Sequence, residues 1–134
     1  MLDGREWLKN EGASEEAISR LSAVASIPLP ESYMSLLRYS NGGEGPLPMD
    51  PWNFCLDRAE LAADTEHGGK LKEFFPKLFV LGTSGGGEAI ALDANVPAPY
   101  PVVQFDLTNC NLAESVRRLA RDFDTFLGLV GRST

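Results

Sequence analysis

The chain has 134 residues, of which 43% are hydrophobic and 23% charged, and it carries a formal net charge of −7. This length suits one domain, so we expect a single domain over residues 1–134 with its own core. The apolar content is too high for a disordered chain. A surface this acidic would be repelled by the phosphates of a nucleic acid.

The sequence also argues against membrane and secreted proteins. No apolar run approaches the ~18 residues of a membrane helix, and residues 1–11 lack the pattern of a secretory signal peptide. Cys55 and Cys110 are too few for a disulfide framework and have no metal-ligand spacing. We therefore predict a cytoplasmic protein with reduced thiols, in which Cys55 packs as a small buried hydrophobe.

Two helices are predicted in the first third of the chain. Ser14 is a typical N-cap, and an apolar stripe at helical spacing follows over residues 17–25 until Pro28 ends the helix. Pro30 can open a second helix, because a proline at the first position loses no needed hydrogen bond. Asn41-Gly42-Gly43 should end this helix, with at least one glycine at positive φ. The predicted buried side of the second helix holds Tyr33, Leu36, Leu37 and Ser40.

The middle of the chain predicts short strands. Residues 52–56 read as one strand, and the spacing of Asp57 and Glu60 resembles a capping box that starts a short helix through Asp64, before a loop at His67-Gly68-Gly69. Three further strands are predicted over residues 78–82, 88–93 and 100–106. Their short connections favour antiparallel pairing.

A long amphipathic helix is predicted near the C-terminus. Its apolar residues recur at helical spacing, and Gly131 would stop it. Helices at both ends of a strand-rich middle predict an α+β fold, with an antiparallel sheet between them. The residues of this predicted stripe are Val116, Leu119, Ala120, Phe123, Phe126, Leu127 and Val130.

No catalytic, cofactor or metal site is predicted. The glycine-rich run at residues 82–88 lacks the Lys-Ser/Thr of a phosphate-binding loop, and Glu88 would repel phosphate, so we expect a hairpin turn with positive φ. His67 is the only histidine, and we expect it to be an exposed loop residue. A pair of carboxylates in a cleft stays open as an enzyme site, although nothing in the sequence selects two of the nineteen acids.

The acidic residues concentrate between positions 44 and 66. Six acids against one base, Arg58, give this stretch −5 of the total −7. Such acids can simply keep a protein soluble, or they can steer a basic partner. Tryptophan is a frequent interface anchor, and it is as often a lid over the core; Trp7 and Trp52 are expected to be partly exposed. The candidate partner-binding residues are Glu44, Asp50, Trp52, Asp57, Asp64 and Glu66, which we predict on one exposed face.

Five sequence segments, in order, resemble the Smi/Knr family of the SUKH superfamily over about residues 14–130. The resemblance implies an α+β fold with a curved antiparallel sheet flanked by helices. The segments are Leu29-Pro30-Glu31-Ser32-Tyr33 with Leu36-Leu37 and Asn41-Gly42-Gly43; Leu81-Gly82 with residues 85–88; Ala91-Leu92-Asp93; residues 100–103; and residues 119–127.

The resemblance also implies a function. In bacteria many members look like immunity proteins that bind and neutralise toxin domains, often nucleases, and the family's motif residues are chiefly structural. The leading hypothesis is therefore a non-enzymatic immunity-type protein, or antitoxin, that binds a basic toxin domain. The alternatives are a housekeeping scaffold or regulator with the same fold and, third, a small carboxylate-dependent enzyme.

Overall fold

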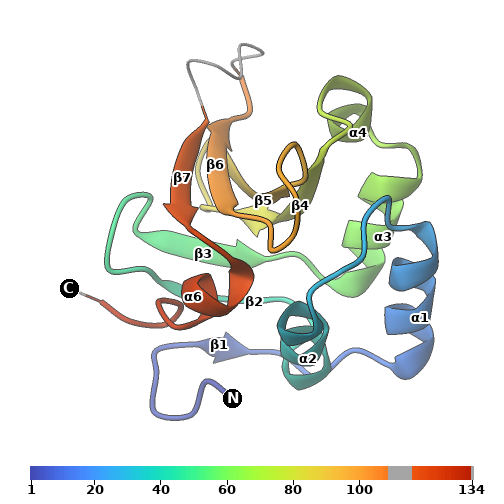
Figure 1. Cartoon of the computed structure of the whole chain (residues 1–134). Coiled ribbons are helices and arrows are strands. Elements are labelled where there is room, and N and C mark those ends of the chain that lie inside the picture. Colours follow the sequence, from blue (N-terminus) through green and yellow to red (C-terminus); the bar gives the residue numbers. More distant parts are fainter. Residues whose placement is uncertain (109–115, 134) are drawn as a thin grey trace.

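The computed structural model describes residues 1–108 and 116–133. In this part of the chain one seven-stranded antiparallel sheet has the strand order β1 to β7, so each strand pairs with its neighbours in sequence (Figure 1). The strands are β1 (Leu8–Lys9), β2 (Gly43–Pro46), β3 (Asn53–Leu56), β4 (Leu78–Thr83), β5 (Glu88–Asp93), β6 (Val102–Asp106) and β7 (Arg117–Ala120).

Helices occupy the connections between strands. Between β1 and β2 lie α1 (Glu15–Val24) and α2 (Glu31–Tyr39); between β3 and β4 lie α3 (Ala59–Gly68) and α4 (Lys70–Phe74); α6 (Phe123–Leu127) follows β7. The sheet is curved, since β1 to β3 run across the view of Figure 1 while β6 and β7 stand upright. The predicted α+β class, with N-terminal helices and a C-terminal helix beside a curved antiparallel sheet, is confirmed.

The main core lies between the helices and one face of the sheet. Tyr33 of α2 sits at its centre, with its ring edge-on to Phe79 at 5.5 Å and to Phe123 at 5.7 Å between centroids. Leu36 and Leu37 are fully buried beside it, and so is Ser40, as the helical spacing predicts. A second, smaller core contains residues of β4, β5 and β6 that do not belong to the main core. In it Phe75 packs against Phe105.

The first two helices form as their local signals predict. The Ser14 side chain accepts a hydrogen bond from the N–H of Ala17 at 3.1 Å, which caps α1. The chain leaves α2 through Gly42 and Gly43, whose φ angles of 90° and 114° lie in the region that favours glycine. The prediction of positive φ at this turn is therefore confirmed.

The predicted start of α3 is confirmed at Ala59, but the capping residue and the end of the helix differ from the prediction. No side-chain cap comes from the residues just before this helix. Instead Asn41 accepts the hydrogen bond from the N–H of Ala59 at 2.8 Å. The helix continues past Asp64 to Gly68, so His67 lies in its last turn rather than in a loop, although it is exposed as expected.

The predicted C-terminal helix is also corrected. Residues 117–120 form β7, which pairs with β6 through Gln104 and Arg117, Val103 and Arg118, and Val102 and Ala120. Asp122 has extended φ and ψ, and its side chain caps the short α6 by accepting from the N–H of Thr125 at 2.7 Å. Edge-strand hydrogen bonds of β6 therefore override the helical periodicity of this segment. Phe123, Phe126 and Val130 are buried, whereas Leu127 is only half-buried.

Candidate functional site

The loop between β2 and β3 carries the exposed tryptophan. Trp52 is 57% exposed, as predicted, and has a φ of +69°, a conformation rare for residues other than glycine. Two backbone hydrogen bonds hold it, from its N–H to the carbonyl of Met49 at 2.7 Å and from the N–H of Leu47 to its own carbonyl at 3.0 Å. The loop thus presents an aromatic side chain to solvent from a fixed backbone.

Two predicted acids belong to this loop and to the strand before it. Asp50 precedes Trp52 in the loop and forms an ion pair with Arg117 of β7 at 3.3 Å, with both side chains more than half exposed. Glu44 is exposed on β2, and its Oε2 lies 3.4 Å from Nδ2 of Asn53 and 3.6 Å from Sγ of Cys55. We call Glu44, Asp50 and Trp52, which belong to β2 and to the loop that follows it, the hairpin group.

The other three predicted acids belong to the α3 region. Asp64 is exposed and pairs with Arg20 of α1 at 2.9 Å. Asp57 is half-buried before α3, and burial raises the pKa of its carboxyl group to about 6. Figure 1 shows α3 on the opposite side of the molecule from the β2–β3 loop.

Glu66 is buried, with a residue exposure of 8%, and holds three elements together. Its Oε1 accepts hydrogen bonds from the N–H and hydroxyl of Ser26, and its Oε2 pairs with Nζ of Lys72 at 2.9 Å. Lys72 also donates to the Ser26 hydroxyl at 2.6 Å. This carboxylate therefore joins the end of α1 to α3 and α4, and it is unavailable to a partner.

The prediction of one exposed face for all six residues is thus wrong. Sequence proximity did not become spatial proximity because β3 crosses the sheet and carries the chain from the hairpin group to α3 (Figure 1). The role of the exposed members in binding a partner stays a prediction.

The remaining candidates from the sequence have plain structural positions. Gly85, with a φ of +86°, turns the chain between β4 and β5, which confirms the predicted hairpin. Cys55 is half-buried rather than buried, because its side of β3 is only partly covered, and burial raises the pKa of its thiol. Cys110 lies outside the described residues. Trp7 is half-buried, and its Nε1 donates to the hydroxyl of Ser40 at 3.2 Å.

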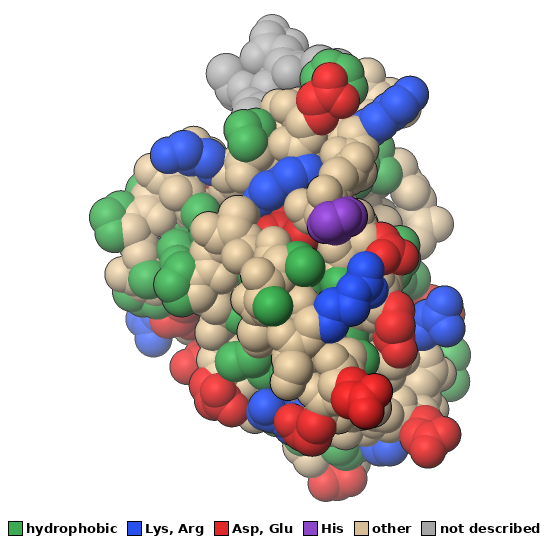
Figure 2. Space-filling model, turned by 90° about the vertical axis from the view of Figure 1, so that its right-hand side faces the viewer, with side chains coloured by type: hydrophobic (Ala, Val, Ile, Leu, Met, Phe, Trp, Pro, Cys, Tyr) green, Lys and Arg blue, Asp and Glu red, His purple; other side chains and the backbone are tan. Residues whose placement is uncertain are grey.

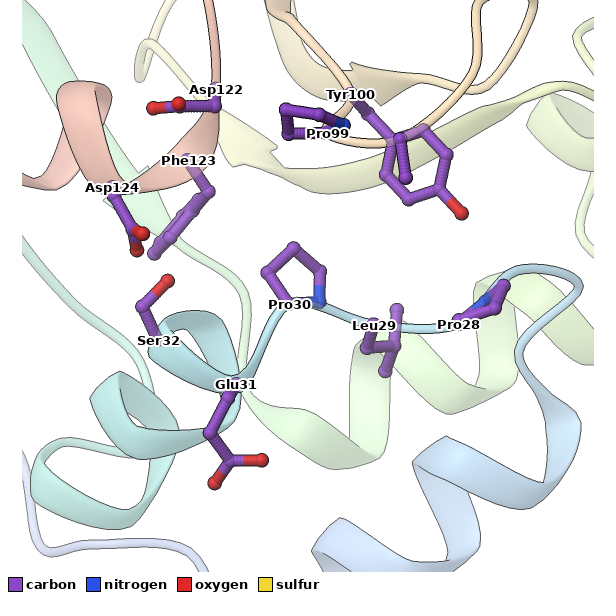
Figure 3. Close-up of a pocket in the computed structure, with 11 residues that line it drawn as sticks. Pro28, Leu29, Pro30, Glu31, Ser32, Pro99, Tyr100, Asp122, Phe123 and Asp124 are labelled. Atoms are coloured by element: carbon purple, nitrogen blue, oxygen red, sulfur yellow. The ribbon is translucent and has the colours of Figure 1, made fainter.

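A cleft of about 390 Å³ opens between three segments that are distant in sequence. We call it the proline cleft. One wall is the linker between α1 and α2, the opposite wall is the β5–β6 loop, and the start of α6 closes one end (Figure 3). Its lining residues are Pro28, Leu29, Pro30, Glu31, Ser32, Ala98, Pro99, Tyr100, Asp122, Phe123 and Asp124.

Every charged residue that lines the proline cleft is acidic. Asp124 and Ser32 point toward one another at the α6 end, while Glu31 extends away from the centre of the cleft (Figure 3). Glu31 pairs with Arg38 at 3.2 Å. Hydrogen bonds from the side chain and the N–H of Thr125 lower the pKa of Asp122 and keep it ionised at neutral pH. The cleft is therefore apolar in the middle and negative at one end.

The sequence analysis did not predict this cleft. Leu29-Pro30 was predicted to start a helix and belongs to a segment that resembles the family, and Pro99 lies in the connection between two predicted strands. Two proline-rich loops, with Pro28 and Pro30 in one and Pro97, Pro99 and Pro101 in the other, were the available signal. Prolines in ordered loops form rigid, donor-poor surfaces, but nothing in the sequence placed one loop against the other.

Acidic side chains also extend over the helical side of the molecule. Figure 2 views the side of α1, α3 and α4, and Asp and Glu side chains predominate over its lower part, with Lys and Arg among them. Glu15 and Glu16 of α1 are exposed and add to the acidic surface beyond the predicted stretch. In the described part of the chain, no three or more His, Cys, Asp and Glu residues are grouped so as to hold a metal ion.

No helix in the described ranges is long and apolar enough to cross a membrane. A search of curated proteins found no match. The family model of the SMI1 / KNR4 family (SUKH-1), however, matches residues 12–128. This span runs from just before α1 to the end of α6 and takes in the linker and loops that line the proline cleft. The chain therefore belongs to the SMI1 / KNR4 family (SUKH-1).

Proposed function

We propose that this chain is a non-enzymatic, immunity-type protein that binds and neutralises a toxin domain with a basic surface. Membership of the SMI1 / KNR4 family carries the proposal, because many bacterial members of this family look like immunity proteins that bind toxin domains. The net charge of −7 supports the sign of the partner's charge, since complementary charges speed association and exclude wrong partners.

The exposed members of the acidic stretch are the proposed contact residues. Trp52 has the exposure and fixed backbone of an anchor, and Asp50 and Glu44 are exposed acids of the same loop and of the strand before it. Asp64, and Asp57 in part, add negative charge near α3. Glu66 contributes only by holding α3 in place.

The test uses the protein encoded by the neighbouring reading frame. That protein is expressed in cells with or without this chain, and survival and direct binding are measured. We expect growth arrest without the chain, rescue with it, and a complex whose association slows as salt rises. An immunity role would be contradicted if the neighbouring protein arrests growth and the chain neither relieves this arrest nor binds that protein.

Variants then locate the contact. Trp52→Ala should accelerate dissociation, with a loss of about 2 kcal/mol or more if the residue is a hot spot. Asp50→Lys with Glu44→Lys should mainly slow association at low salt. Phe74→Ala, which removes an exposed aromatic side chain of α4 that is not among the proposed contact residues, is the matched control for Trp52. Equal effects of Trp52→Ala and Phe74→Ala would remove Trp52 from the interface.

A further inference from the structure

We propose that the proline cleft receives an arginine side chain of the partner, with the aliphatic stem between the proline walls and the guanidinium at the Asp124 end. The inference rests on the proposed function, because the arginine belongs to the basic surface of the toxin. It adds a second contact site, between the α1–α2 linker, the β5–β6 loop and the start of α6, and names the chemistry that this site accepts.

The size of the cleft limits what can enter. About 390 Å³ is near the lower end of the range for ligand pockets, which is roughly 300–1,000 Å³. A long side chain with a little of its backbone fits this space, whereas a folded element does not. The cleft therefore suits one projecting side chain rather than a flat interface.

The walls favour an apolar stem. Pro30 projects from the α1–α2 linker toward Pro99, and the ring of Tyr100 lies beside Pro99 above the linker (Figure 3). Proline has no backbone N–H to donate, so these walls offer few groups that a polar chain could bind. Long cationic side chains bury their methylene groups on such surfaces while the charged head stays at a polar rim.

The charges at the end of the cleft fix the sign of the head group. Asp122 and Asp124 lie there, and no ion pair of Asp124 is found among the described residues. The base nearest to Asp122, Arg121, is 3.9 Å away at its Nε. Asp122 already accepts the N–H of Thr125 at 2.7 Å, so this N–H is not available to an anion, which the two carboxylates would also repel.

Arginine fits this combination better than lysine. Its guanidinium is planar, is more weakly hydrated than an ammonium, stacks on aromatic rings and donates two parallel hydrogen bonds to a carboxylate. Asp124 supplies the carboxylate, with the Ser32 side chain opposite it and the ring of Phe123 beside it, while Tyr100 lies at the other end of the cleft (Figure 3).

The test first uses a small probe, so that it does not depend on the toxin. N-acetyl-arginine methylamide is titrated into the isotope-labelled full chain, and backbone amide resonances are followed by NMR. The neutral isostere, N-acetyl-citrulline methylamide, is the matched probe. We expect saturable shifts at Leu29, Ser32 and Phe123 with the arginine probe and much weaker binding of the citrulline probe. Equal binding of both probes, or shifts confined to other surfaces, would overturn the proposal.

The matched variants remove charge without removing the helix cap. Asp122→Asn with Asp124→Asn keeps a good N-cap, because asparagine caps as well as aspartate. Glu16→Gln with Glu73→Gln makes the same change in net charge at exposed sites away from the cleft. The cleft pair should weaken binding of the arginine probe about three- to ten-fold, and the control pair should leave it unchanged. If both double variants lost the same affinity for the arginine probe, the attraction would come from the overall charge of the protein, and the proposal would be overturned.

The same pairs are then measured with the toxin. Toxin binding that survives in the cleft pair at the level of the control pair would overturn this inference and leave the immunity function standing. A wild-type chain that binds no toxin would instead overturn the immunity function, and the probe titration would still decide whether the cleft selects arginine.

Discussion

Asn41, just beyond the end of α2, caps the start of α3 by accepting a hydrogen bond from the N–H of Ala59 over 2.8 Å. Its side-chain amide also donates to Oε1 of Glu60 at 2.9 Å, and its own N–H donates to the carbonyl of Glu11. One residue thus joins the segment before α1, the end of α2 and the start of α3.

Replacing Asn41 with Ala should lower the free energy of unfolding by about 1–2 kcal/mol, because a helix cap and a second hydrogen bond are lost. Urea unfolding followed by circular dichroism measures the change. Asp57→Ala is the control, since Asp57 stands at the position that the sequence pattern chose for the cap. If Asp57→Ala cost as much as Asn41→Ala, the capping assignment would be contradicted.

Glu66→Ala should be strongly destabilising, by about 3–5 kcal/mol, because it leaves Lys72 without its buried partner and the N–H of Ser26 without its acceptor. Asp64→Ala is the matched control on the same helix. Its exposed pair with Arg20 should contribute only about 0.2–1 kcal/mol. Similar losses in the two variants, measured by thermal and urea unfolding, would show that Glu66 is not the buried link between α1, α3 and α4.

The half-buried carboxyl of Asp57 should make stability depend on pH. Its folded pKa of about 6 lies above the value of about 3.9 expected when unfolded, so the folded state binds the proton more tightly. Stability from this group is therefore full below pH ~4 and is lost as the pH rises through about 6.

Asp57→Asn should accordingly stabilise the protein by about 1–2 kcal/mol at pH 7, after allowance for partial exposure, and have little effect at pH 4. The measurement is the difference in unfolding free energy between variant and wild type across this range. A difference for Asp57→Asn that stays flat across this range would mean that burial does not raise its pKa.

Phe123→Ala should cost about 3–5 kcal/mol, because the ring is 2% exposed and packs edge-on against Tyr33. Leu127→Ala, on the same short helix, should cost clearly less, since Leu127 is half-buried. Urea unfolding of both variants gives the comparison. A loss below about 1 kcal/mol for Phe123→Ala would mean that α6 does not seal the core.

Local signals in the sequence were enough to predict several elements. Ser14 determined the start of α1, because its side chain needs only the backbone N–H of Ala17, three residues later, to cap the helix. The glycines after α2 determined its end, because only their positive φ lets the chain turn there. The continuous apolar run Ala89-Ile90-Ala91-Leu92 predicted β5 at its observed bounds, since both faces of that strand are covered.

Other features depended on contacts between distant segments. The apolar spacing of residues 116–130 fits a helix by itself, and the free edge of β6 decided that residues 117–120 form a strand. Asn41 replaced the local capping pattern of α3 from 18 residues away. Glu66 looked like any solvated acid until Lys72 and Ser26 enclosed it.

The proline cleft shows the same limit for function. Its linker and its β5–β6 loop each carry ordinary turn residues, and their sequences contain no sign that they face one another. The sequence determined which residues are acidic, apolar or rigid. Only the folding of the sheet, which brings Pro30, Pro99 and Asp124 around one space, decided that these properties act together.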